Sequence, residues 1–228
     1  MLRWPAAEGG GARVREAPSV EPGQLTSVDA APSLAQRRKA ALRLDIAREA
    51  VRLFAAQGVT GTTGEQIARA VGISARTLWR YFPTKESCVL PLLAVGLDFA
   101  MERLRHWPPE ASLLDFFTNS CRHGELPPAT PAILDLIRMT STDPALRAVW
   151  LQAHDDALPV LGELLAQRSG GDADDLRVRV HAATINGALR AAAEEFARRY
   201  ADDPEASGGE IVTCLVAALR AASEGLPY

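Results

Sequence analysis

The sequence predicts an all-α fold, and three observations support this. Ala and Leu dominate the composition and, together with Arg and Glu, favour helix over strand. Apolar residues recur at intervals of three and four, whereas β-branched residues never alternate over a useful length. Clusters of Gly, Pro and Asp separate these periodic stretches. An apolar share of 47% and a charged share of 23% are typical of a soluble globular chain of this length, 228 residues.

The first helix follows an N-terminal segment of different composition. Residues 1–34 are rich in Gly, Pro, Ala and Ser and lack apolar periodicity, so we expect a disordered extension. Helical periodicity begins near Leu34 and places Ile46 and Phe54 on one apolar face. Gly58 then supplies the left-handed residue that ends this helix.

The next three helices are separated by strong breakers. A short helix is expected over about 63–71, and a second over 75–82, which Ser74 caps and Pro83 stops. A longer helix follows over about 84–105, with its first residue, a threonine, as the cap. We therefore assign a compact helical module to residues 35–86.

The rest of the chain, residues 87–228, reads as a larger helical body. Thr130 with Pro131, and Asp143 with Pro144, are typical helix openings of a capping residue followed by proline. Beyond the helix that begins at residue 84, the sequence predicts helices over about 113–123, 131–141, 144–168, 176–200 and 210–223.

Charge is divided unevenly between these parts. The net charge of the chain is −3, but residues 37–85 hold ten Lys or Arg against three acidic residues, a local charge of +7. The remainder therefore carries −10. This asymmetry is typical of a basic module that binds nucleic acid, joined to an acidic body.

The helix over 75–82 has two unlike faces. At 100° per residue Leu78 and Phe82 point inward together. The outer face carries Arg76, Thr77, Arg80 and Tyr81, with Trp79 at its border. A helix, a tight turn and a second helix of this kind indicate a helix-turn-helix whose second helix enters the major groove of DNA. The alternative is a helix pair with a solvated charged face.

Residues 41–90, ALRLDIAREAVRLFAAQGVTGTTGEQIARAVGISARTLWRYFPTKESCVL, resemble the N-terminal domain of the tetracycline-repressor (TetR) family. An apolar helix ending in Phe and Gly is followed by Thr-Thr, Ile-Ala, Gly-Ile-Ser, Thr-Leu, Tyr-Phe and Thr-Lys-Glu at the family's spacing. The resemblance implies an N-terminal helix-turn-helix domain and a helical domain for ligand binding and dimerisation.

The resemblance also implies residue roles. Arg76 and Arg80 would meet base edges. Positions that the family uses mainly on phosphates, or at the start of the preceding helix, are Thr63, Thr77, Trp79, Tyr81 and Lys85. Two residues depart from the family pattern: Trp79 stands where Tyr is usual, and Gly64 replaces an apolar or hydroxyl residue. We expect Gly64 to weaken the helix start at that point.

The resemblance further implies a homodimer formed through the last two helices. In the first of them, Ile185, Leu189, Ala192, Phe196 and Tyr200 form a large apolar stripe, and Ala183, Gly187 and Ala191 form a small one. The small stripe allows another helix to approach closely. The alternative is that both stripes belong to a core within one chain.

For the unknown small-molecule ligand, the candidates are polar or aromatic residues in otherwise apolar helices: Trp107, Phe117, Arg138, Trp150, His154 and Asn186. The plainer interpretation of each is ordinary core packing. We expect a mainly apolar pocket bordered by residues 90–104 and 138–190, with Asn186 or Arg138 as its polar anchor.

Other classes of protein find little support. No apolar run approaches the roughly 20 residues that span a bilayer, and the start of the chain is not typical of a secretory signal. The histidines and cysteines lack metal-ligand spacing, and nothing supplies an activated nucleophile. The three cysteines lie far apart and favour a reducing cytoplasm.

The sequence therefore predicts a cytoplasmic DNA-binding transcriptional regulator, without enzymatic activity, metal or cofactor. Its partners would be operator DNA, a second copy of itself and a small ligand that releases it from the operator. The alternative from another class is a helical dimer that acts through protein contacts without binding an operator.

Overall fold

The computed structural model describes residues 33–122, 130–199 and 208–224. These residues form helices and turns and contain no strand, which confirms the predicted all-α fold. The predicted disordered extension lies outside the described residues except for its last two. Of these, Ser33 caps the first helix and Leu34 is its first residue, so the helical module begins slightly earlier than predicted.

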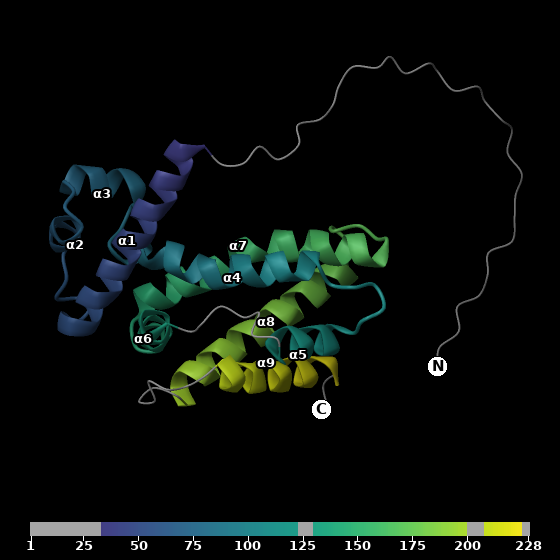
Figure 1. Ribbon diagram of the computed structural model, residues 1–228. Helices are drawn as coiled ribbons and strands as arrows, with labels where there is room; N and C mark the ends of the chain where they lie inside the picture. Colours follow the sequence, from purple (N-terminus) through teal and green to yellow (C-terminus); the bar gives the residue numbers. More distant parts are fainter. Residues whose placement is uncertain (1–32, 123–129, 200–207, 225–228) are drawn as a thin grey trace, which may run out of the picture.

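Three helices form the N-terminal module, which lies at one end of the molecule (Figure 1). They are α1 (Leu34–Gln57), α2 (Gly64–Ala70) and α3 (Ala75–Tyr81). Gly58 ends α1 at φ 80°, and Gly72 makes the turn between α2 and α3 at φ 75°. Glycine occupies this left-handed region without the steric cost that a Cβ adds.

The predicted helix over 84–105 is wrong at its start. Thr84 precedes a short 3₁₀ turn, η1 (Glu86–Val89), and its hydroxyl accepts a hydrogen bond of 3.1 Å from the Ser87 amide. The α-helical part, α4, spans Leu90–Arg105 with Pro91 in its first turn. Proline has no N–H to donate to the preceding turn, so regular α-helical bonding starts only here.

The body consists of α4, α5 (Leu113–Arg122), α6 (Pro131–Thr140), α7 (Pro144–Ser169), α8 (Leu176–Arg199) and α9 (Gly208–Ser223). In Figure 1, α4 runs along α7 and α8 along α9, and these pairs are in contact. Asp143 caps α7 as expected, whereas Thr130 precedes α6 without a side-chain capping bond.

The apolar core crosses the predicted domain boundary at residue 86. One cluster joins the inner side chains of α1, α2 and α3 to Leu92 of α4, Leu136 of α6 and Trp150 of α7. A second cluster lies among α5, α8 and α9 around Phe117 and Phe196. The N-terminal module therefore rests on α4, α6 and α7, and is not joined to the body by the chain alone.

Cys88 and Cys214 are buried, as expected for small apolar side chains. Burial raises the pKa of the Cys88 thiol to about 12, so the unreactive thiol form dominates. The side chain of Cys121 lies outside the described residues. Among the helices described, none combines the length and apolar character needed to cross a membrane.

Candidate DNA interface and ligand cavity

Helix α3 presents its two arginines to solvent, as the sequence predicted. Leu78 and Phe82 are buried beneath it, while Arg76 and Arg80 are exposed. The Ser74 hydroxyl caps the helix by accepting a hydrogen bond of 3.1 Å from the Thr77 amide. An exposed helix with two guanidinium groups on an apolar base has the shape and the donors that major-groove recognition needs.

A cation–π contact joins the end of α3 to α1, and a second lies within α3. The Lys39 ammonium lies 5.8 Å from the centre of the Tyr81 ring, and the Arg80 guanidinium lies 5.3 Å from it. Lys39 is exposed and so extends the basic surface of α3. We did not assign Lys39 from the sequence, although its place in the run Arg37-Arg38-Lys39 was a signal.

The two departures from the family pattern, Trp79 and Gly64, contact each other. The indole of Trp79 packs over Gly64 so closely that a Cβ there would lie 2.1 Å from Cζ2 and 2.2 Å from Cη2. Trp79 remains 41% exposed, and Gly64 is buried under it. The Trp79 ring of α3 therefore fits here because Gly64 of α2 has no side chain.

Other residues secure the start of α2, which Gly64 was expected to weaken. The Thr63 hydroxyl accepts from the Gln66 amide at 3.2 Å, and the Thr63 amide donates to the Gln66 side chain at 2.7 Å. This reciprocal capping box satisfies amide groups that a helix start leaves unpaired. Thr63 is exposed beside α3, at the position predicted for it.

Lys85 is directed away from the predicted phosphate contact. Its ammonium donates to the main-chain carbonyls of Val59 at 2.6 Å and Thr62 at 2.8 Å, and its side chain is only 23% exposed. These bonds hold the loop between α1 and α2 against the start of η1. The structure therefore supports a role for Lys85 in stability, and its phosphate contact stays a prediction.

We expect Lys85→Ala to lower the free energy of unfolding by about 1.5–3 kcal/mol, because hydrogen bonds to a charged donor are lost. The salt dependence of DNA binding should stay unchanged. Chemical denaturation and binding titrations at several salt concentrations measure the two effects, with the exposed Arg48→Ala as control. A salt slope reduced by about one per half-site at unchanged stability would restore the phosphate role.

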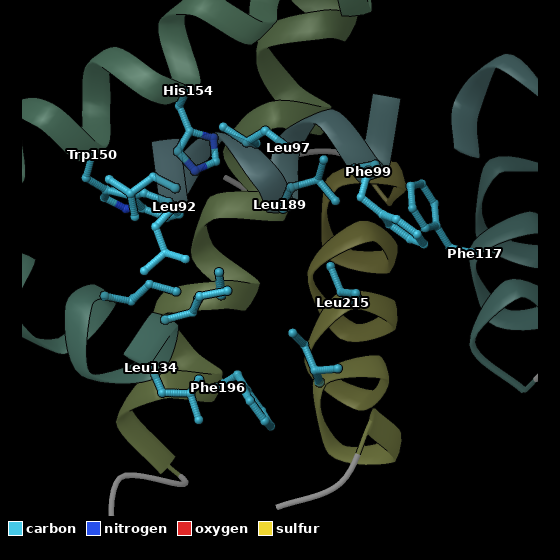
Figure 2. A pocket seen from close by; sticks show the side chains of 17 residues that line it. Leu92, Leu97, Phe99, Phe117, Leu134, Trp150, His154, Leu189, Phe196 and Leu215 are labelled. Carbon is cyan, nitrogen blue, oxygen red and sulfur yellow. The ribbon is translucent and has the colours of Figure 1, made fainter. Parts of the chain in front are cut away.

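A cavity of about 150 Å³ lies inside the body, between the helices where the sequence predicted a pocket. Side chains from α4, α5, α6, α7, α8 and α9 line it, and nearly all are apolar (Figure 2). Leu92, Leu97 and Phe99 come from α4, Leu134 from α6, and Leu189 and Phe196 from α8. A mainly apolar wall of this kind suits a ligand of low polarity.

The six candidate ligand residues separate into two groups. Phe117, Trp150 and His154 line the cavity, whereas Trp107, Arg138 and Asn186 do not. The Arg168 guanidinium lies 3.5 Å from the centre of the Trp107 ring, and Arg138 forms an ion pair with Asp135. The polar groups of the predicted anchors, Asn186 and Arg138, bind protein partners outside the lining. Of the polar candidates, His154 and Trp150 border the cavity.

His154 is held by a pair of hydrogen bonds to Asn186. The Asn186 Oδ1 lies 2.8 Å from His154 Nδ1, and the Asn186 Nδ2 donates to the His154 main-chain oxygen at 3.0 Å. Burial is the main cause that lowers the pKa of His154 below its ordinary value. Its ring stands edge-on to the Trp150 ring, with centres 4.3 Å apart.

Several lining residues carried no polar signal and were missed from the sequence. Phe99, Leu134 and Phe196 look like core residues, and only the packing of six helices shows that they border a cavity. The sequence did indicate that some residues of α4 face the interior, because Leu93 and Leu97 repeat at helical spacing.

The N-terminal module is a helix-turn-helix whose second helix exposes two arginines. It rests on an all-helical body that contains a cavity. Together these features define a DNA-binding transcriptional regulator. Family comparisons agree. Residues 46–92 match the family described as bacterial regulatory proteins, tetR family, and residues 127–227 match the MftR C-terminal domain. The chain belongs to the tetR family, which confirms the resemblance seen in the sequence.

Two curated relatives are similar to this chain over most of its length. The transcriptional regulator TcmR of Streptomyces glaucescens is 32% identical over 185 residues, which are 77% of this chain and 81% of TcmR. MftR of Mycobacterium tuberculosis, a regulator named for mycofactocin biosynthesis, is 30% identical over 174 residues, or 71% and 83% of the two chains.

A solved structure shares the fold. It is a protein from Mesorhizobium loti assigned to the TetR family, with a TM-score of 0.50 and 20% identity. The similarity covers 82% of this chain and 97% of that one. The predicted function class, a DNA-binding transcriptional regulator, is therefore confirmed, while the roles of individual residues stay predictions.

Proposed function

We propose that this regulator is a dimeric repressor that leaves its operator when a small, mostly apolar ligand enters the cavity. The observation that carries the proposal is the position of the cavity wall. Leu92 and Leu93 of α4 and Ile133 and Ile137 of α6 line the cavity, and α4 and α6 both pack on α1 of the DNA-binding module.

The DNA contacts follow from the exposed face of α3. Arg76 and Arg80 would read base edges, since the guanidinium fork matches the two acceptors of guanine. Phosphate contacts are assigned to Thr63, Thr77, Trp79 and Tyr81, which lie on or beside the same face, and Lys39 joins them. Lys85 is not included, because main-chain carbonyls already take its ammonium. Such a protein acts where the bacterial chromosome lies, in the cytoplasm.

The dimer is assigned to the exposed face of α8. Ala183, Gly187 and Ala191 continue a line that begins with Leu176, 72% exposed, and Val180, 52% exposed. A continuous line of exposed apolar residues on one helix is typical of an interface. Two recognition helices about 34 Å apart would then meet successive major grooves on one side of the duplex.

The last helix contributes less to this face than the sequence predicted. Its residues Leu215 and Leu219 are buried within the protomer, as are Leu189 and Phe196 of the large α8 stripe. The burial of Leu189 and Phe196 supports the alternative of an intramolecular core for this part of the large stripe, so the proposed dimer contact uses the small stripe.

Release from DNA requires a ligand that prefers one arrangement of the recognition helices over another, because equal affinity shifts no equilibrium. Helix α4 follows the DNA-binding module in the chain and gives one path from the cavity to α1. In the structure α6 gives a second path, since it lines the cavity and also contacts α1. A ligand that moves α4 or α6 would change the position of α1 and, through the shared core, that of α3.

The Arg76→Ala variant tests this function. Gel shifts with DNA fragments that flank the gene should show operator binding by the wild type. The variant should lose about 1–3 kcal/mol per contact on the operator and relax specificity at one base pair of each half-site. Its affinity for random DNA should change little.

Arg69→Ala on α2, exposed but outside the recognition helix, is the matched control and should retain specificity. Equal weakening of Arg76→Ala on operator and random DNA would reassign Arg76 to a phosphate. A wild type that shifts no fragment would favour the alternative of a helical dimer acting through protein contacts.

A further inference from the structure

One end of the cavity carries a single polar atom. His154 is 2% exposed, and its Nε2 is buried without a hydrogen-bond partner among the described residues. Figure 2 shows the His154 ring extending from its helix toward the other side chains that line the cavity. Among the described lining residues, only Trp150 also has a side-chain nitrogen or oxygen, and it donates to Glu194 at 2.8 Å.

The hydrogen bonds of Asn186 determine which proton His154 carries. The amide Nδ2 can only donate, and it faces a carbonyl, which can only accept. Rotating the amide by 180° would bring two oxygens together, so the orientation is fixed. Oδ1 then faces His154 Nδ1, and Nδ1 must carry the hydrogen. In the neutral ring, Nε2 is left as an acceptor with a free lone pair.

The surroundings favour the neutral ring. Burial lowers the pKa of His154, and the positive charges of Arg190 and Arg147 act in the same direction. The bond to Asn186 and the charge of Glu194 act in the opposite direction, but the pKa remains below its ordinary value of 6.5. At pH 7 the ring is therefore mainly uncharged, and Nε2 accepts a hydrogen bond but does not donate one.

The size and polarity of the cavity restrict what can pair with this atom. A volume of about 150 Å³ matches that of engineered cavities that bind benzene. Water is a poor partner, since a buried water needs about two to four polar neighbours and this end of the cavity offers one. A ligand of one ring would fill the apolar part and leave one substituent beside Nε2.

We propose that the cavity takes a small uncharged ligand of the phenol class, whose hydroxyl group donates a hydrogen bond to His154 Nε2. A carboxylate fits badly, because its oxygens are acceptors and would face a lone pair in an apolar chamber. That such a ligand also acts as the effector rests on the proposed function, which takes this cavity as the effector site.

Binding of phenol and toluene to the full-length dimer tests the inference, with calorimetry as the measurement. The two molecules have nearly the same shape, but only phenol has a hydroxyl. Water solvates that hydroxyl, so a cavity without an acceptor favours toluene. We therefore expect the affinity of phenol relative to toluene to fall by about tenfold in His154→Leu. Toluene binding itself should persist, and benzoate should bind neither form.

Two further measurements separate hydrogen bonding from a structural effect of the variant. In the wild type, ¹⁵N chemical shifts of the His154 ring should show the proton on Nδ1. The Nε2 resonance should move on addition of phenol but not of toluene. Asn186→Leu removes the acceptor of Nδ1, so the proton can move to Nε2, and the relative affinity for phenol should fall in this variant too.

A protonated Nε2 in the ligand-free protein, or an unchanged phenol-to-toluene ratio in His154→Leu, would overturn the inference. Failure of both phenol and toluene to bind would also overturn it, while operator binding by the wild type would still stand. If phenol binds through His154 but the operator complex survives at saturating phenol, the inference holds. The proposed release mechanism would then be wrong.

Discussion

Gly187→Leu is expected to convert the dimer into monomers of 24.5 kDa and to abolish tight operator binding. The added side chain would stand on the exposed small-residue face of α8, where the second copy should approach closely. Binding through two linked half-site contacts raises the affinity for the operator about 10²–10⁴-fold over one contact. A monomer should therefore lose affinity by a factor in that range. Light scattering and gel shifts measure the two effects.

The structure makes this variant a clean test. A Cβ at Gly187 would meet no atom of the other described helices within 4 Å, so a side chain can begin there without a clash in the protomer. Ala56→Leu is the control, because it adds similar bulk at an exposed position of α1, away from α8. This variant should still have the mass of a dimer. A Gly187→Leu protein that still scatters as a dimer would place the interface on another face.

Gly64→Ala is expected to weaken operator binding by more than about tenfold, because overpacking costs about 1–3 kcal/mol and a dimer carries the change twice. The new methyl group would lie 2.1 Å from the Trp79 ring. Either the indole leaves its place or α3 moves relative to α2, and both changes displace groups that face DNA. Gel shifts and thermal denaturation of the variant measure the loss.

The same substitution should have the opposite effect on stability when Trp79 is absent. In a Trp79→Ala background the methyl group meets no ring, and alanine is a better helix former than glycine by about 1 kcal/mol. Gly64→Ala should then be neutral or stabilising, so the two changes are strongly coupled. An equal loss in both backgrounds would show that Gly64 is needed for a reason other than the Trp79 contact.

The helix-turn-helix was predictable because its determinants are local. Helix α3 begins after Ser74 and ends before Pro83, and its inner and outer faces follow from a periodicity of 3.6 residues. The exposed positions of Arg76 and Arg80 therefore needed no knowledge of the remaining chain. The same reasoning misplaced the start of α4, because Pro91 acts on a turn that the sequence pattern treated as regular helix.

Contacts between distant residues were not predictable in this way. Lys85 lies 26 residues from Val59, and the spacing that suggested a phosphate contact says nothing about a carbonyl within reach. Trp79 and Gly64 each departed from the family pattern, but their complementarity appears only when α2 and α3 are packed. His154 and Asn186 were both candidates for the ligand site. Only their mutual hydrogen bonds show that Asn186 holds the His154 ring in place.

The sequence by itself determined the all-α class, the basic recognition helix and the family, because these depend on residue types at fixed short spacings. The tertiary structure decided which face of α8 stays exposed, which side chains border the cavity and which nitrogen of His154 faces it. These properties depend on how six helices meet across long stretches of chain. Packing and hydrogen bonding between helices follow no sequence period, so only the folded arrangement specifies them.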